Sequence, residues 1–250
     1  MEAFNHKKRP YICVPITGQT KEEVMQQLDI IVEQAPDVIE WRADFFSHLY
    51  DVEQTIEIVN EMKRKTDIPI LLTIRAEHEG GENIDLKEEE KVDLIQEICQ
   101  NTSVDIIDYE TSNDKRFVEK VREVTKENGQ QLILSYHHFS ETPEDKELIE
   151  RAKLAKKFGA DMIKIAVMPQ SKDDVFRLLE ITRKIDQIID KPLITMSMGD
   201  IGALSRIIGW VYGSILTFGV GVKSSAPGQI EVGKLREAIE KTQELLPSWK

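Results

Sequence analysis

The sequence predicts an α/β fold in which eight parallel strands close into a (β/α)8 (TIM) barrel. Three observations support this prediction. Short β-branched runs alternate with amphipathic stretches along the whole chain. The runs are too continuous for strands with one exposed face, as expected for parallel strands covered on both faces. The length of 250 residues matches the usual size of such a barrel. No linker or composition shift divides the chain, so we expect one barrel domain over residues 1–250.

Each predicted strand is a run too short for a helix and too continuous for a strand with one exposed face. In order, these runs cover residues 11–17, 37–44, 69–75, 104–110, 131–137, 160–167, 192–198 and 213–220. Alternating strands and helices imply a parallel sheet with right-handed crossovers. An open doubly wound sheet is the alternative. It usually has a Gly-rich loop after its first strand, where this chain has Gly18 alone.

The stretches between the runs are predicted helices, and several have recognisable first turns. Thr20 and Glu23 have the spacing of a capping box. Thr142 with Pro143 and Asp145 opens a second helix, and Ser171 opens a third. A final helix covers 231–246. The faces that we expect to be buried are Val24, Leu28, Ile31 and Val32 in the first, Ile149, Ala152, Leu154 and Ala155 in the second, and Val175, Leu178, Leu179, Ile181 and Ile185 in the third.

The charge balance limits the classes of partner. Lys and Arg number 33 against 45 Asp and Glu, which gives a formal net charge of −12. Nucleic-acid binding needs clustered basic residues, so we expect no nucleic-acid partner. A small anionic substrate is still compatible, because a few arginines reverse the sign of the charge inside a pocket.

The cysteines and the apolar segments indicate where in the cell the protein is located. Cys13 and Cys99 form no CxxC pair, which indicates a reducing compartment, and no signal peptide is recognisable. We therefore expect a cytoplasmic protein. Residues 201–222 are apolar enough to suggest a membrane span, but Arg206 interrupts them. A buried helix followed by a buried strand explains this segment better, so we expect no membrane association.

Polar side chains collect where the strands end, which in a barrel is the edge that carries active sites. Glu40, Arg42 and Asp44 alternate along one face of the second run, and Arg75 ends the third. Buried charges need partners. These side chains therefore form either an ion-pair network that fills the barrel or the polar floor of a pocket.

Acidic residues follow the third and fourth runs. Glu77, His78 and Glu79 precede two glycines, and each of the three alone fits a solvated loop. Asp108 and Glu110 share one face of the fourth run, where they are placed to orient a neighbouring cation.

Two adjacent histidines, His137 and His138, end the fifth run and must point to opposite sides of the strand. Only one of them therefore faces the pocket. A histidine at a strand end is often structural, but its usual pKa also suits proton transfer near neutrality.

Lys164 lies between Ile163 and Ile165 in the sixth run. Lysine is almost never fully buried unless it is paired or functional. Burial disfavours the ammonium form, and the neutral amine attacks carbonyl groups. Two interpretations stay open. Lys164 is an imine-forming nucleophile, or it snorkels to the rim or pairs with a carboxylate such as Glu40.

The last two units contribute an arginine and a loop. Arg206 is predicted at the start of a short helix in an apolar run, where its guanidinium is suited to hold a substrate carboxylate. Residues 223–229 have the composition of a movable flap, although a plain loop explains them as well. Met196 and Met198 fit core packing or an apolar pocket wall.

Six motifs in chain order resemble the type I 3-dehydroquinate dehydratase family. They are EWRAD (40–44), TIRAEHEGG (73–81), SYHHF (135–139), DMIKIAVMP (161–169), ITMSMGDIGALSR (194–206) and KSSAPGQI (223–230). Each motif alone is a weak signal, but six in this order, each at a strand end, are specific. The resemblance runs from about residue 11 to the C-terminus.

The resemblance implies a barrel enzyme, usually a homodimer, that acts in the shikimate pathway of aromatic amino-acid biosynthesis. Enzymes of this family remove water from 3-dehydroquinate to give 3-dehydroshikimate without metal or cofactor. The resemblance implies Lys164 as the Schiff-base lysine, His137 as the general acid/base and Glu79 as the acid that orients this histidine. The substrate-binding positions that it implies are Glu40, Arg42, Arg75, Arg206, Ser225 and Gln229.

The chain departs from the family pattern in two places. Pro15 stands where several family members have a serine that contacts the substrate, so that contact is either lost or supplied by Thr17. Some members carry an N-terminal hairpin over the barrel bottom, and the ten residues before Tyr11 are few for a long one.

Two other functions remain as alternatives. A Schiff-base aldolase on the same barrel would also use a lysine in the sixth strand. The chain has no Gly-rich phosphate site after the seventh and eighth runs, which disfavours a phosphorylated sugar as substrate. A catalytically silent binding barrel would bind a ligand without turnover. The presence of Lys164, His137 and Arg206 together disfavours it.

Overall fold

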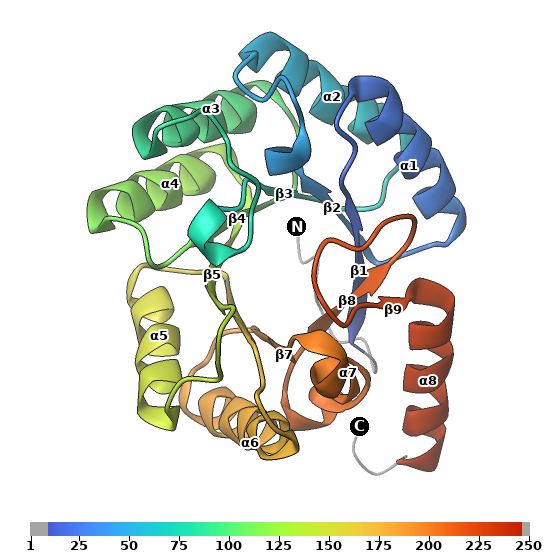
Figure 1. The fold of residues 1–250 in the computed structure, drawn as a ribbon. Coiled ribbons are helices and arrows are strands. Elements are labelled where there is room, and N and C mark those ends of the chain that lie inside the picture. The colour runs from blue at the N-terminus through green and yellow to red at the C-terminus, as the bar shows by residue number, and fades with distance from the viewer. Residues whose placement is uncertain (1–9, 247–250) are drawn as a thin grey trace.

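The computed structural model describes residues 10–246, which form a ring of parallel strands surrounded by helices (Figure 1). The strands are β1 (Tyr11–Ile16), β2 (Val38–Arg42), β3 (Ile70–Thr73), β4 (Ile106–Glu110), β5 (Gln131–His138), β6 (Met162–Val167), β7 (Leu193–Ser197), β8 (Leu216–Val220) and the short β9 (Ile230–Glu231). The α-helices are α1 (Lys21–Glu33), α2 (Val52–Lys65), α3 (Glu88–Asn101), α4 (Lys115–Asn128), α5 (Asp145–Lys157), α6 (Lys172–Ile188), α7 (Gly199–Ile208) and α8 (Val232–Leu245). Three 3-10 helices are η1 (Ala43–Phe45), η2 (Glu77–Glu79) and η3 (Gly209–Tyr212).

The sheet closes on itself in the order of the chain. Each strand from β1 to β6 pairs in parallel with the next, and β8 pairs in parallel with β1. The bridge between Leu193 and Ser214, and the 2.8 Å hydrogen bond from Ile215 N to Leu193 O, bring the start of β8 against β7. The predicted (β/α)8 barrel is therefore confirmed, and the open sheet was the wrong alternative. The sequence analysis did not predict β9 or the 3-10 helices.

The barrel interior is apolar at the N-terminal ends of the strands and polar at their C-terminal ends. The apolar part consists of inward-facing side chains from every strand from β1 to β8: Tyr11, Cys13, Val38, Leu71, Ile106, Ile133, Met162, Ile194 and Leu216. Residues paired in register point to the same side of a sheet. The pairs Glu110–Ser135 and Ser135–Lys164 therefore place three polar side chains next to one another inside the barrel. A second apolar cluster fills the space between the sheet and the helices.

Two predicted helix starts are confirmed in their capping contacts. Thr20 Oγ1 accepts a hydrogen bond from Glu23 N at 3.3 Å, although the Glu23 carboxylate binds Gln19 N and not Thr20 N. Ser171 and Asp174 form a complete capping box, with distances of 3.3 and 3.2 Å. The predicted face of α6 is buried throughout, and so is that of α1 except for the half-buried Val32.

Two predictions about helices are wrong. Helix α5 begins at Asp145, because Thr142 is held in the preceding loop: its hydroxyl donates to Met168 O and its carbonyl accepts from Arg177. Its buried stripe is Leu148, Ala152 and Ala155, with Ile149 and Leu154 half-buried at the edges. Arg206 lies in the last turn of α7 and not at its start, because that helix already begins at Gly199.

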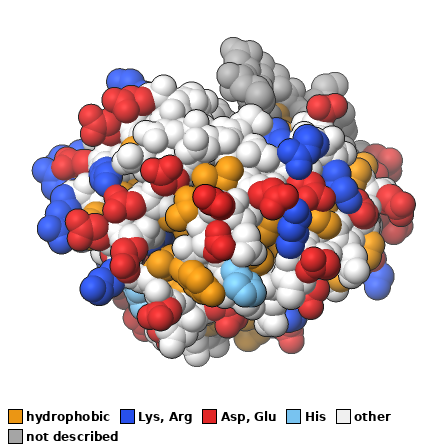
Figure 2. Space-filling view, turned by 90° about the horizontal axis from the view of Figure 1, so that it is seen from above, with side chains coloured by type: hydrophobic (Ala, Val, Ile, Leu, Met, Phe, Trp, Pro, Cys, Tyr) orange, Lys and Arg blue, Asp and Glu red, His pale blue; other side chains and the backbone are white. Residues whose placement is uncertain are grey.

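The surface carries charges of both signs, and the apolar segment 201–222 is divided between several elements. Figure 2 shows acidic and basic side chains mixed over one face of the molecule, with apolar side chains between them. Among residues 10–246, no helix has both the length and the hydrophobicity that a membrane span requires. The apolar segment 201–222 instead contains most of α7, then η3 and β8. Cys13 and Cys99 are both buried and free.

The capping box of α6 generates a stability prediction. We expect Ser171→Ala to lower the free energy of unfolding by about 1 kcal/mol, because the substitution removes the acceptor for an unpaired helix N–H group. Urea denaturation measures the change. Ser103→Ala is the control, because Ser103 is exposed and precedes β4 outside any helix cap. An equal loss in both variants would contradict the cap assignment.

Candidate active site

A cavity opens at the C-terminal ends of the strands. It brings together every residue predicted from the sequence as catalytic or substrate-binding: Glu40, Arg42, Arg75, Glu79, His137, Lys164, Arg206, Ser225 and Gln229. The apolar side chains of its wall are Phe139, Ala166, Met196, Met198, Phe218 and Ala226. The cavity is therefore lined by both charged and apolar side chains.

Lys164 extends from β6 into the barrel and is 5% exposed. Its Nζ lies 2.9 Å from Asp108 Oδ2, 4.0 Å from Glu40 Oε1 and 4.5 Å from the centroid of the Phe218 ring. The lysine therefore does not snorkel to the rim. It is paired with a carboxylate, and Asp108 is a closer partner than the predicted Glu40.

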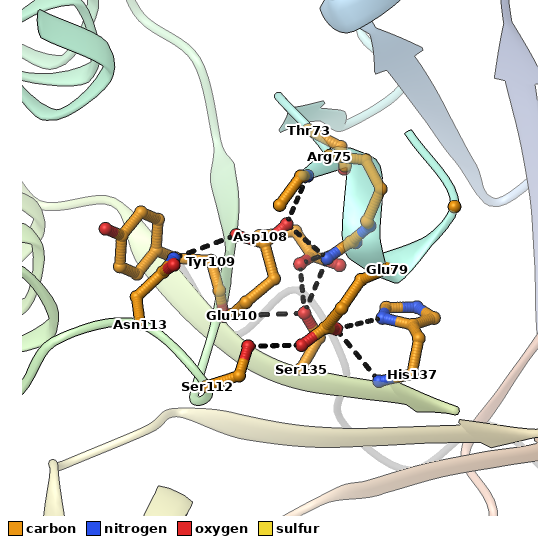
Figure 3. A network of polar contacts seen from close by, with 12 residues as sticks. Thr73, Arg75, Glu79, Asp108, Tyr109, Glu110, Ser112, Asn113, Ser135 and His137 are labelled. Atoms are coloured by element: carbon orange, nitrogen blue, oxygen red, sulfur yellow. Dashed lines mark hydrogen bonds and ion pairs between the residues drawn. The ribbon is translucent and has the colours of Figure 1, made fainter. Parts of the chain in front are cut away.

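Asp108 belongs to a network of buried charges on β3, β4 and β5 (Figure 3). Its Oδ1 lies 2.8 Å from Arg75 Nη2 and accepts a 2.6 Å hydrogen bond from Ser135 Oγ. Arg75 Nη1 donates to Glu110 Oε1 at 2.8 Å and to Ser135 Oγ at 2.9 Å. The prediction that Asp108 and Glu110 orient a cation is confirmed, and the cation is the guanidinium of Arg75.

These ion pairs decide the protonation of their members. Burial alone would raise the pKa of Asp108, but Arg75 and Lys164 outweigh it and hold that pKa below its usual value. Burial likewise opposes the charged form of Arg75, yet Asp108 and Glu110 raise its pKa above the usual value. Both side chains are therefore charged at neutral pH.

His137 and Glu79 form a second pair in the cavity wall. His137 Nδ1 and the His137 backbone N–H each lie 2.9 Å from Glu79 Oε2. The other carboxylate oxygen of Glu79 accepts a hydrogen bond from Ser112 Oγ. With its proton on Nδ1, directed at Glu79, the imidazole carries a free electron pair on Nε2. His138 points to the other side of β5 and packs against the Tyr136 ring, so the prediction of opposite faces is confirmed.

Burial is the largest influence on both members of this pair. It raises the pKa of Glu79 to about 7, against the opposing effect of Arg75. It also lowers the pKa of His137 well below its usual value, and Arg75 and Lys164 act in the same direction. The imidazole is therefore neutral at physiological pH, as a general base must be.

Arg206 reaches the cavity from α7 and is 2% exposed. Within the described residues, the partners of its guanidinium are all uncharged: Pro227 O at 3.0 Å, Phe218 O at 3.5 Å and Met196 Sδ at 3.5 Å. Its Nε has no hydrogen-bond partner, and within residues 10–246 no carboxylate lies at ion-pair distance from it. Burial lowers the pKa of Arg206 to about 10, so it stays charged at neutral pH. A buried cation without an anion is suited to bind an anionic ligand.

Arg42 and Glu40 on β2 are held in place by side chains that do not themselves line the cavity. Arg42 makes a bidentate contact with Asp44, at 2.8 and 2.7 Å, and its Nη1 donates to Ser225 O at 3.3 Å. Glu40 accepts a 2.9 Å hydrogen bond from Thr73 Oγ1. The predicted ion-pair network and the predicted pocket floor therefore overlap: Arg42 is ion-paired and lines the cavity, whereas Asp44 is ion-paired without lining it.

The loop between β8 and β9 covers one side of the cavity. Gln229 Oε1 accepts from Ser225 N at 3.0 Å, and Gln229 Nε2 donates to Ser225 Oγ at 3.3 Å. Pro227 O accepts hydrogen bonds from Gly199 N at 3.1 Å and from Arg206. Gly228 has φ +74° and packs on the Gly199 backbone, where a Cβ atom would lie 2.1 Å from Gly199 O. The loop is thus docked against the first turn of α7.

The sequence analysis missed several residues that contact the functional side chains. Ser112 and Ser135 are small polar residues in common sequence contexts, and nothing in the sequence marks them. Lys91 on α3 did leave a signal. It continues the apolar stripe of Leu94, Ile95 and Ile98, and its side chain is buried against Glu110.

The structure bears on one of the two departures from the family pattern, Pro15 in place of serine, and does not describe the other, the short N-terminal segment. Pro15 is buried in β1 beside Glu40, and Thr17 is buried with no hydrogen-bond partner for its hydroxyl. Neither lines the cavity, so nothing in the structure assigns the missing contact to Thr17. The expectation about an N-terminal hairpin concerns residues 1–9, which lie outside the described part of the chain. Within the described part, no three His, Cys, Asp or Glu side chains are arranged to hold a metal ion.

A barrel whose C-terminal edge has a cavity lined by a buried lysine and a neutral histidine is typical of a (β/α)8-barrel enzyme. Comparisons with known proteins identify the family. The model of the type I 3-dehydroquinase family matches residues 12–245. The chain therefore belongs to the type I 3-dehydroquinase family.

Curated relatives and solved structures agree with this assignment. The 3-dehydroquinate dehydratase of a Geobacillus species (strain WCH70) is 42% identical over 94% of this chain and 91% of its own length. That of Albidiferax ferrireducens is 44% identical over 93% and 88%. The crystal structure of the Geobacillus kaustophilus enzyme superposes with a TM-score of 0.93 at 40% identity, covering 95% of this chain and 92% of that one. A Clostridium difficile type I 3-dehydroquinate dehydratase with covalently modified comenic acid gives 0.92 at 36% identity, covering 96% and 94%.

The environment of His137 generates a pH prediction. We expect its imidazole to titrate below the usual 6.5, because burial and the cations Arg75 and Lys164 disfavour the imidazolium. Ring ¹⁵N chemical shifts followed against pH measure this, and the His137→Gln spectrum assigns the signal. Since the unfolded chain binds this proton more readily, His137 also lowers the stability of the fold as the pH falls below about 6.5. A titration midpoint at 6.5 or above would contradict the assignment.

Proposed function

We propose that this chain removes water from 3-dehydroquinate to give 3-dehydroshikimate, the dehydration step of the shikimate pathway, through a Schiff base on Lys164. The observation that carries the proposal is the buried Lys164 amine in a cavity that also holds His137 and Arg206. Membership of the type I 3-dehydroquinase family supports the same reaction. So does the relative from Clostridium difficile, whose structure contains a covalently modified ligand.

In the proposed reaction, the electron pair of Lys164 Nζ attacks the ketone carbon of the substrate, and water leaves as the C=N bond forms. The imine withdraws electrons and acidifies the adjacent carbon. His137 Nε2 takes a proton from that carbon to give an enamine. The enamine expels the neighbouring hydroxyl group, which departs as water with the proton from His137. Hydrolysis of the imine consumes one water, frees the amine and releases the product, so that one water is lost overall.

The surrounding side chains have distinct roles in this proposal. Asp108, 2.9 Å from Nζ, holds the amine in position and accepts a hydrogen bond from it in either protonation state. Glu79 orients His137 through the 2.9 Å contact with Nδ1, which directs Nε2 to the substrate. As proposed, each step uses side chains alone, with neither a metal nor a cofactor.

We assign substrate binding to the remaining residues of the cavity. Arg206 binds the substrate carboxylate, because it is a buried cation without a carboxylate partner in the described chain. Glu40, Arg42 and Arg75 contact the ring hydroxyls from β2 and the end of β3. Ser225 and Gln229 close the cavity from the loop after β8, where both already line it. Together these assignments define a carboxylated, polyhydroxylated ring as the ligand.

We also infer a cytoplasmic homodimer organised as one catalytic domain. The family model spans 12–245, which supports the single domain. The two free cysteines support a reducing compartment. Analytical ultracentrifugation of the full chain tests the homodimer, and a sedimentation coefficient of a monomer at micromolar concentration would contradict it.

The Schiff base is tested by trapping. We expect sodium borohydride to inactivate the protein only when 3-dehydroquinate or its product is present, because reduction requires the C=N bond. Mass spectrometry of the digested protein is expected to place the adduct on the peptide that contains Lys164. The variant Lys164→Ala is expected to accept no adduct and to lose nearly all turnover, measured by the absorbance of the conjugated product.

The control for trapping is Lys153→Ala, which removes an exposed lysine on α5 and is expected to keep both activity and adduct. If borohydride leaves the enzyme fully active during turnover, or if the adduct maps to another lysine, the Schiff-base mechanism fails. The dehydration itself is then tested separately by the absorbance assay.

The role of Arg206 generates a second prediction. We expect Arg206→Lys to raise KM about 10-fold or more with a smaller change in kcat, because a point charge does not replace the planar fork of a guanidinium. Steady-state kinetics measure both constants. Arg183→Lys on the exposed face of α6 is the matched control and is expected to change neither. A KM unchanged in Arg206→Lys would remove the assignment.

A further inference from the structure

Lys91, in the first turn of α3, is a buried cation that the proposed reaction does not use. Its side chain is 2% exposed, and its Nζ lies 3.0 Å from Glu110 Oε2 and 3.6 Å from Glu88 Oε1. Cations stabilise the C-terminal end of a helix, so a lysine near the N-terminus opposes the helix dipole. The stability of α3 therefore does not explain the position of this residue.

Lys91 is the outer end of a chain of alternating charges that leads to Lys164. Glu110 lies between Lys91 and Arg75, at 3.0 and 2.8 Å. Arg75 then contacts Asp108 at 2.8 Å, and Asp108 contacts Lys164 at 2.9 Å. The five charged side chains from Lys91 to Lys164 are each at most 5% exposed. The interactions are therefore little screened by water, and each charge affects the position of the next.

We propose that Lys91 is a positioning residue for Lys164, which it controls through Glu110, Arg75 and Asp108. By neutralising Glu110, Lys91 keeps the guanidinium of Arg75 shared between Glu110 and Asp108. This sharing sets how strongly Asp108 holds the Lys164 ammonium, and so how readily the amine is released for attack. The inference rests on the proposed Schiff-base role of Lys164.

The direction of the effect follows from the charges. Without Lys91, Glu110 attracts Arg75 more strongly, and Asp108 loses part of its neutralising partner. Asp108 then holds the Lys164 ammonium more tightly, so imine formation slows and requires a higher pH. If Glu110 also loses its charge, Arg75 is free to neutralise Asp108 fully. The ammonium is then held less tightly, and imine formation proceeds at a lower pH than in the parent.

A purely structural ion pair would behave differently. Buried ion pairs on average add little stability compared with apolar residues of the same shape, whereas removing one partner costs several kcal/mol. Loss of Lys91 therefore lowers stability under either interpretation. Only a positioning role of Lys91 predicts that the pH dependence of imine formation moves in opposite directions in the single and the double variant.

The other titratable or charged groups around Lys164 keep their chemical identity in these variants. They are Cys13 on β1, Glu40 and Arg42 on β2, Arg75 after β3, Glu79 in η2, Asp108 on β4, His137 on β5 and Arg206 on α7. None of these residues is substituted in the test. A moved pH profile therefore reports a change transmitted from Lys91 to Lys164.

The test measures imine formation directly in the full chain. Parent and Lys91→Met are mixed with 3-dehydroquinate, quenched with borohydride at short times and analysed by intact-protein mass, at several pH values. We expect Lys91→Met to form the imine about 10-fold more slowly at pH 7, in line with the coupling seen between neighbouring charges. The pH of half-maximal rate is expected to move up, and KM to change much less than kcat.

Two further variants make the result specific. Lys63→Met removes a comparable ion pair, Lys63–Asp105 at 2.7 Å, at the opposite end of β4, and is expected to lower the melting temperature without changing imine formation. The double variant Lys91→Met with Glu110→Gln removes both charges of the outer pair. Its pH of half-maximal rate is expected to move below that of the parent.

Each outcome supports or overturns the inference. Lys91→Met with a parent-like rate and pH profile overturns it, and so does an equal slowing in Lys63→Met. If Lys91→Met does not fold, the double variant decides: a profile moved to lower pH supports the inference and an unchanged profile overturns it. If the parent itself forms no adduct on Lys164, the proposed Schiff-base function has failed instead.

Discussion

The buried carboxylate of Asp108 is the constraint on which the rest of the site depends. An isolated charge in the interior of a barrel costs several kcal/mol, so the fold must supply partners to both of its oxygens. Arg75 and Ser135 occupy one oxygen and Lys164 the other. These partners come from β5, β6 and the residues after β3, and the strand register places them on one side of the sheet. The pairing that satisfies the buried charges also positions the reactive amine.

Much of this was predictable from the sequence, because barrel strands and their ends have simple signatures. Continuous β-branched runs located every strand from β1 to β8. The rule that active sites lie at the C-terminal strand ends then selected Glu40, Arg42, Arg75, His137 and Lys164 for consideration. The roles of Glu79, Ser225 and Gln229 came from the family resemblance, since each alone fits an ordinary loop. All of them line one cavity.

The rest depended on contacts between distant parts of the chain. Asp108 was expected to orient a cation, but the sequence could not show that both Arg75 and Lys164 are its partners. The start of α5 was misplaced because Met168 and Arg177, far along the chain, hold Thr142 in a loop. Arg206 was assigned to the wrong end of α7 because its apolar run hides the first turn of that helix. In each case a tertiary contact overrode the local pattern.

Arg206 and Arg42 are cations of the site that also hold the loop after β8. Both arginines donate to backbone carbonyls of this loop, Arg206 to Pro227 O at 3.0 Å and Arg42 to Ser225 O at 3.3 Å. A carbonyl oxygen carries only a partial negative charge, so it compensates a buried guanidinium incompletely, whereas Arg42 also has the full charge of Asp44. Arg206 therefore gains most from a carboxylate that enters the cavity. Because the same guanidinium holds the loop, a ligand that neutralises Arg206 also acts on the segment that contributes Ser225 and Gln229. The position of this loop therefore depends in part on the same side chain that is suited to bind an anionic ligand.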